Sequence, residues 1–175
     1  WIPPWGWSAQ HYELTLKNFF LAIILMAFGC AKQPASPHFV GKVTAVLAKD
    51  GQSVLVTWKE AGLGNNLNID YEASANGTAI YVCVNNAGNC PNAANKTTVS
   101  GPVTSTVTLS SGQNGQISGS LVLLPPGAGS FSCPGGQTLT LSEVSYTDIA
   151  ITDVTNNVSS AATPDELSAA LFACP

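Results

Sequence analysis

From residue 39 onward, short runs of alternating apolar and polar residues dominate the chain, such as FVGKVTAVLA at residues 39–48 and SVLVTW at residues 53–58. Alternation with a period of two directs every second side chain to the same face of a β-strand. Segments rich in Gly, Asn, Ser and Pro separate these runs at intervals of roughly 8–12 residues, and Asp50-Gly51 is a strong signal for a tight hairpin turn. The pattern predicts an all-β domain built as an antiparallel sandwich or barrel.

The end of the chain, TPDELSAALFAC at residues 163–174, has a different pattern. Thr163 fits an N-cap, Pro164 fits the first helical position, and Glu166 lies three residues after the cap, as in a capping box. These features predict one short helix over residues 164–174. Its expected role is to cover an open edge or end of the sheet.

The apolar run FFLAIILMAFG at residues 19–29 determines the expected compartment. It is too short to span a bilayer, which takes roughly 20 apolar residues, and it lacks the polar stripe of a helix that faces water. Lys17 precedes the run and Gly29-Cys30 ends it, which is typical of a secretory signal. We therefore expect residues 1–29 to be a leader and the protein to be exported.

The same run divides the chain into segments. If translation starts at Leu16, residues 1–15 are not part of the protein and residues 16–29 are the signal peptide. The proline-containing stretch 30–38 shows no periodicity and is expected to be a linker. Residues 39–175 then form the β-domain with its C-terminal helix.

The sequence MAFGC at residues 26–30 resembles the lipobox of bacterial lipoproteins, in which a small residue precedes a cysteine that is lipidated and becomes the new N terminus. Gly29 fits the small position, whereas Ala27 and Phe28 differ from the usual Leu and Ala or Ser. The resemblance implies lipidation at Cys30 and anchoring at the bacterial cell surface. Ordinary signal-peptidase cleavage nearby, with Cys30 incidental, is the alternative.

Four further cysteines remain in the chain, Cys83, Cys90, Cys133 and Cys174. An even number in an exported chain predicts two disulfides, because the compartment is oxidising. A zinc site would need cysteine pairs at CxxC-like spacing, which these lack. We predict Cys83–Cys133 and Cys90–Cys174, since Cys83 ends an apolar strand and Cys133 precedes a proline that favours extended backbone. The rival arrangement is the local pair Cys83–Cys90 with Cys133–Cys174.

The segment GKVTAVLAKDGQSVLVTWKEAGLG, residues 41–64, has a strand, a hairpin and a second strand that ends in Trp58. It resembles the start of a fibronectin type III or related immunoglobulin-like domain, a likeness that covers residues 39–160. The resemblance implies an antiparallel immunoglobulin-like β-sandwich with Trp58 buried between two sheets, and it implies no activity. Immunoglobulin domains place the tryptophan between their two cysteines, whereas Trp58 precedes both Cys83 and Cys133.

The residues needed for several kinds of chemistry are missing from the sequence after the leader. His38 is the only histidine there and no GxSxG elbow occurs, so a serine hydrolase would lack its base. Charged residues are 9% of the chain, and the net charge of −4 with six scattered lysines argues against nucleic acid. We expect no enzyme activity and no cofactor.

Acidic residues offer two weaker candidates for a binding site. Asp70 and Glu72 are two apart, so they share one face of a strand, where they would bind a cation, contact a sugar hydroxyl or simply be solvated. Asp148 and Asp153 with Asn156 would supply oxygen ligands for calcium, but no spaced calcium-binding loop is present. We therefore predict no metal site.

The segment YVCVNNAGNCPNAANK at residues 81–96 concentrates asparagines around two cysteines. Tyr81, Asn85, Asn86 and Asn89 are candidate ligand-binding residues, because amides pair with sugar hydroxyls and tyrosine stacks on sugar faces. The alternative is that Asn and Gly serve only to form turns.

The function expected from the sequence is a non-catalytic structural or adhesive module at the bacterial cell surface or outside the cell, assembling with copies of itself into a fibre through strand edges. The alternative is an extracellular carbohydrate-binding domain. The expected partners are further copies of the chain or a glycan, with membrane contact through the lipid anchor only and no nucleic acid.

Overall fold

A computed structural model describes residues 36–90 and 95–173, and this part of the chain is all-β, without an α-helix. The leader and Cys30 lie outside these residues. No helix within the described ranges is long and apolar enough to cross a membrane. The strands are β1 (His38–Phe39), β2 (Val43–Leu47), β3 (Val54–Ala61), β4 (Asn68–Asn85), β5 (Lys96–Ser110), β6 (Gln116–Leu123), β7 (Gln137–Asp153), β8 (Val158–Thr163) and β9 (Leu167–Ala170).

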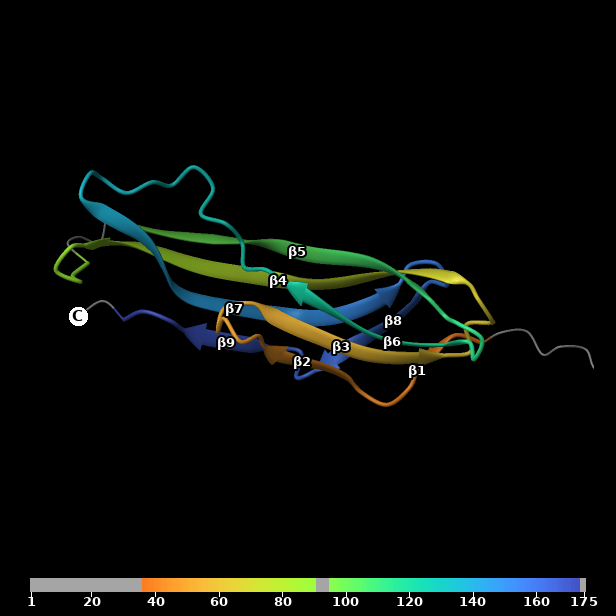
Figure 1. Ribbon diagram of the computed structural model, residues 1–175. Helices are drawn as coiled ribbons and strands as arrows, with labels where there is room; N and C mark the ends of the chain where they lie inside the picture. Colours follow the sequence, from red (N-terminus) through yellow and green to blue (C-terminus); the bar gives the residue numbers. More distant parts are fainter. Residues whose placement is uncertain (1–35, 91–94, 174–175) are drawn as a thin grey trace, which may run out of the picture. The chain divides into compact units, whose positions relative to one another are not determined.

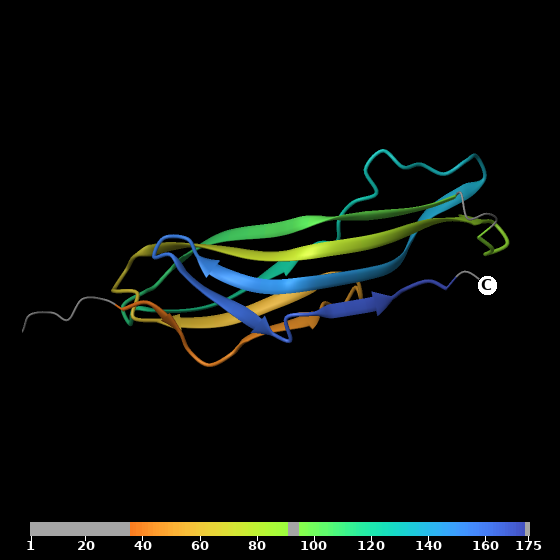
Figure 2. The same ribbon diagram turned by 180° about the vertical axis from the view of Figure 1, so that it is seen from behind.

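The strands form a mixed sheet in the order β1-β3-β2-β8-β7-β4-β5, with β6 paired to β3 and β9 paired to β7. Strands β5, β4 and β7 form one layer, and β6, β3 and β2 lie across from it (Figure 1). Seen from behind, β8 continues from the β7 hairpin to β2 and joins the two layers (Figure 2). The β2–β8 pairing is parallel, through Val43↔Ala162 and Thr44↔Thr163, so the prediction of a purely antiparallel sheet is wrong at this junction.

The predicted hairpin at Asp50-Gly51 is confirmed, because β2 and β3 pair antiparallel on either side of it. The turn is longer than the two residues expected, since the last strand pair is Leu47↔Val54. Gly51 has a φ of 72°, which favours glycine. The Asp50 carboxylate accepts hydrogen bonds from the Ser53 hydroxyl at 2.6 Å and the Ser53 N–H at 2.9 Å. These bonds lower the pKa of Asp50 and stabilise the turn.

The core lies between the two layers, and every second residue along each strand contributes a side chain to it. Along β3, Val54, Val56, Trp58 and Glu60 are buried, whereas the residues between them are more exposed. Trp58 is only 2% exposed, and its ring centroid lies 4.9 Å from that of Tyr71. The prediction that Trp58 is a buried core residue is confirmed.

The predicted helix over residues 164–174 is wrong in the part that is described, because β9 pairs antiparallel with Glu143–Tyr146 of β7. The Ile149 N–H donates to the Asp165 carbonyl at 3.1 Å where the chain turns into β9. Leu167 then packs against the core. A helix this short is marginal on its own, whereas the edge of β7 offers backbone partners and an apolar surface. Tertiary pairing therefore overrides the capping pattern.

The predicted bridge between Cys83 and Cys133 is confirmed, with a Cα–Cα distance of 5.5 Å. It ties the end of β4 to the segment that precedes β7, and it excludes the local pairing of Cys83 with Cys90. Cys90 is itself disulfide-bonded. Its predicted partner, Cys174, lies outside the described residues, so that pairing stays a prediction.

Candidate functional site

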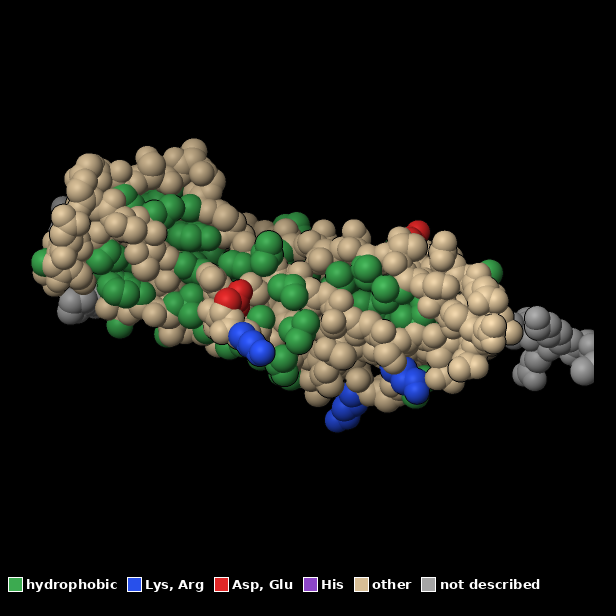
Figure 3. Space-filling view, in the orientation of Figure 1, with side chains coloured by type: hydrophobic (Ala, Val, Ile, Leu, Met, Phe, Trp, Pro, Cys, Tyr) green, Lys and Arg blue, Asp and Glu red, His purple; other side chains and the backbone are tan. Residues whose placement is uncertain are grey.

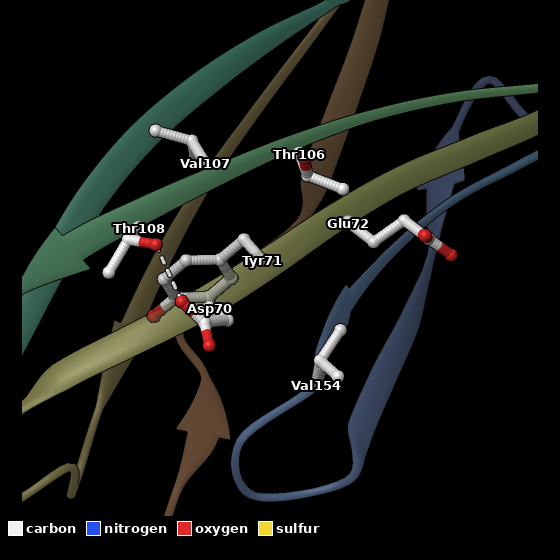
Figure 4. A pocket seen from close by; sticks show the side chains of 7 residues that line it. All are labelled: Asp70, Tyr71, Glu72, Thr106, Val107, Thr108 and Val154. Atoms are coloured by element: carbon white, nitrogen blue, oxygen red, sulfur yellow. Dashed lines mark hydrogen bonds between the residues drawn. The ribbon is translucent and has the colours of Figure 1, made fainter.

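A shallow groove of about 460 Å³ lies on the side of β4 and β5 that faces away from the core (Figure 4). The side chains of Asp70 and Glu72 from β4 and of Thr106 and Thr108 from β5 provide its polar groups. Val154, in the turn after β7, is 56% exposed and adds an apolar contact. The groove brings together the acidic pair that the sequence placed on one strand face.

Strand alternation and register build this groove. Tyr71 and its neighbours two residues away point into the core, so Asp70 and Glu72 point outward. The β4–β5 register sets Asp70 opposite Thr108 and Glu72 opposite Thr106. It brings the Thr108 hydroxyl to the Asp70 carboxylate. This partner of Asp70 could not be assigned from the sequence, because the pairing joins residues far apart in the chain.

Hydrogen bonds hold the Asp70 side of the groove in place. The Thr108 hydroxyl donates to Asp70 Oδ1 at 2.6 Å. The Asp70 N–H donates to the Thr155 hydroxyl at 2.9 Å, and the Val154 N–H donates to the Asp70 carbonyl at 2.8 Å. These bonds orient Asp70 as an acceptor for a ligand hydroxyl or amine.

The two carboxylates of the groove both lie on β4, on the outer surface of the sheet. Acid–base cleavage of a glycosidic bond uses two carboxyl groups on either side of the bond. Asp70 and Glu72 lie two apart on the same face of β4. This arrangement suits reversible contact with polar groups of a ligand.

The candidate ligand-binding residues at 81–89 lie outside this groove. The Tyr81 hydroxyl donates to the Pro126 carbonyl at 2.8 Å, and Tyr81 is half-buried, which raises its pKa. A Cβ on Gly77 would meet the Pro126 ring at 2.9 Å, so glycine allows the segment after β6 to pack against β4 here. The phenol hydroxyl thus has a structural partner.

The Asn85 side chain of the same segment shapes its turn. Asn85 Oδ1 accepts hydrogen bonds from the Ala87 N–H at 3.0 Å and the Asn89 N–H at 2.9 Å. Asn86 and Asn89 are exposed. The alternative reading of the sequence, in which these residues form turns, accounts for Asn85.

The carboxylates of Asp148 and Asp153 do not converge on one site. Asp148 is exposed, has a φ of 55°, and accepts a hydrogen bond from Asn76 Nδ2 at 2.9 Å. Asp153 is fully buried and accepts bonds from the Asn156 N–H at 2.9 Å and from Asn156 Nδ2 at 2.6 Å. Within residues 36–90 and 95–173, no three or more potential metal ligands of the His, Cys, Asp and Glu types gather.

Glu60 is a polar core residue that the sequence reasoning missed. It continues the inward face of Val54, Val56 and Trp58, and this period of two is the signal that could have identified it. The Tyr71 hydroxyl donates to Glu60 Oε2 at 2.7 Å. Burial is the main cause that raises the pKa of Glu60, and burial also raises the pKa of Tyr71.

No protein-family model, curated protein or solved structure matches the chain.

Proposed function

We propose that this domain is a non-catalytic structural or adhesive module, displayed at the bacterial cell surface or outside the cell, which assembles with copies of itself through a strand edge. In this proposal the two packed layers are an immunoglobulin-like β-sandwich in which β8 supplies a parallel junction. The observation that carries the proposal is the long outer strand β5, which is hydrogen-bonded along one edge only in the described part of the chain.

Strand β5 spans 15 residues, and β4 is its only strand partner within the described ranges. The opposite edge therefore presents backbone N–H and C=O groups that suit another strand. Pro102 lacks an N–H and interrupts this edge. The stretch after it, VTSTVTLS at residues 103–110, has no Pro, Gly or charge and is rich in β-branched residues. It combines the properties that favour addition of a strand.

The surface and the covalent chemistry support export. The Cys83–Cys133 disulfide is consistent with an oxidising compartment. Few charged side chains appear on the face shown in Figure 3, which agrees with their share of 9%. In this proposal Cys30 carries the lipid anchor, and an intact mass of membrane-extracted protein that still includes residues 1–29 would contradict that part.

Lysines on the free edge are expected to abolish self-association. Thr104 and Thr106 are exposed on β5, and Thr104→Lys/Thr106→Lys would bring like charges close together when two such edges pair. Sedimentation velocity and electron microscopy of the full chain should show assemblies for the wild type and monomers for this variant.

The matched control is Ala161→Lys, at an exposed position on β8, a strand with partners on both sides. This variant should assemble like the wild type. A wild-type chain that stays monomeric at all concentrations, or an edge variant that assembles normally, would contradict assembly through β5.

Extracellular carbohydrate binding is the second candidate function, and the groove at Asp70 and Glu72 favours it over the Tyr81 segment. Carboxylates beside hydroxyls pair well with sugar hydroxyls. Glycan-array binding should then be lost in Asp70→Asn/Glu72→Gln and retained in Tyr81→Phe. Binding that survives the double substitution would exclude the groove as the glycan site.

A further inference from the structure

Two buried carboxyl groups meet where the layers pack together. Glu60 comes from β3 in one layer, and Asp153 ends β7 in the other. Both residues are 0% exposed. The β4–β7 register sets Tyr71 opposite Asp153, and the Tyr71 hydroxyl reaches Glu60, so both acids border Tyr71 in the core. Burial, and after it the charge and hydrogen bonding of Asp153, raise the pKa of Glu60. Two neighbouring acids away from water need a neutralising partner.

The groups around the pair satisfy three of its four oxygens. Tyr71 of β4 donates to Glu60 Oε2, and Asn156 donates to both Asp153 oxygens. A positive charge on His38 of β1 would lower the pKa of Glu60, against the larger raising effect of burial. Glu60 Oε1 is buried and lacks a hydrogen-bond donor in the described residues.

We propose that Glu60 and Asp153 hold one proton between them, and that this pair is a pH-sensitive lock joining the β3 layer to the β4–β7 layer. A proton on Glu60 Oε1 turns the unpartnered oxygen into a donor to Asp153, so every oxygen of the pair is then satisfied. Two ionised carboxylates at this place would repel each other without solvent to screen them. No third acidic or histidine ligand joins them in the described chain to favour a metal ion over a proton.

The direction of the pH effect follows from the raised pKa of Glu60. A carboxyl group that is more easily protonated in the folded state stabilises the fold fully below its unfolded pKa of about 4.3. This contribution is lost as the pH rises through the folded pKa. The lock is therefore closed in mildly acidic solution and weakens as the solution becomes more alkaline.

Glu60→Gln in the full chain tests the lock, because its amide donates to Asp153 and its carbonyl accepts from Tyr71 at every pH. Chemical unfolding from pH 4 to pH 9 should show the unfolding constant of the wild type rising relative to that of the variant. The rise should reach at most about tenfold per pH unit, the limit for one proton, and then level off. Glu143→Gln on the exposed face of β7 is the control and should not change the pH profile.

Carbon NMR titration of the Glu60 carboxyl provides a readout that does not depend on a variant folding. The wild-type midpoint should lie above the ordinary value for glutamate. Asp153→Asn should lower this midpoint, because it removes the negative neighbour, and Tyr71→Phe should raise it, because it removes the donor that favours the ionised form. An ordinary wild-type midpoint, or a constant ratio of unfolding constants, would overturn the proposal. Calcium that stabilises the wild type but not Glu60→Gln would also overturn it, in favour of a metal site.

Discussion

Replacing Trp58 with alanine is expected to lower the free energy of unfolding by about 3–5 kcal/mol, the range for large aromatic side chains in cores. Trp58 is 2% exposed and packs on Tyr71 between the layers. Its neighbour across the β3–β6 pairing is Gly119, where an added Cβ would lie 2.6 Å from the indole ring. The ring thus occupies space that both the partner strand and the opposite layer leave for it, and alanine would leave a cavity there.

Urea unfolding followed by circular dichroism measures this loss, and Trp58→Phe is the control. Phenylalanine keeps an aromatic ring beside Tyr71 and removes much less volume than alanine does. Its expected loss is therefore much smaller than that of alanine. Against a total stability of about 5–15 kcal/mol for a domain, the alanine variant should be only marginally folded. An unchanged urea midpoint for Trp58→Ala would show that the Trp58 ring does not contribute to the stability of the core.

Removing the bridge between Cys83 and Cys133 is expected to lower the free energy of unfolding by about 4 kcal/mol, from the chain entropy of a closed loop of this size. The two cysteines are 50 residues apart in sequence. Cys83 is buried, so the double variant Cys83→Ala/Cys133→Ala keeps an apolar group at that position. The closed loop runs from the end of β4 through β5 and β6 to the segment before β7. Removing the bridge frees the unfolded chain over this stretch.

Thermal unfolding compares the melting temperature of the wild-type protein, with its disulfide formed, with that of the double variant. The variant should melt at a lower temperature without loss of strand content. Equal melting temperatures would mean that strain or residual structure offsets the loop entropy.

The sequence alone was sufficient for those features that depend on near neighbours. Alternation in VLVTWKEA orients Trp58 inward in any half-buried strand, and the same alternation applies to Glu60. The turn at Asp50-Gly51 depends on local backbone preference, and it forms where expected. The Cys83–Cys133 bridge joins residues 50 apart. It was nevertheless predicted correctly, because the extended character of the segment around each cysteine is a local property.

Only the tertiary structure decided which distant segments become neighbours. The capping pattern after Thr163 favours a helix by a small local margin, whereas pairing with β7 supplies backbone hydrogen bonds and burial for Leu167, so β9 forms instead. The parallel contact between β2 and β8 and the meeting of Glu60 with Asp153 also join residues about a hundred positions apart. These contacts are stabilised by strand register and by burial between the layers. A periodic pattern in the sequence carries no information about which strand will lie alongside another.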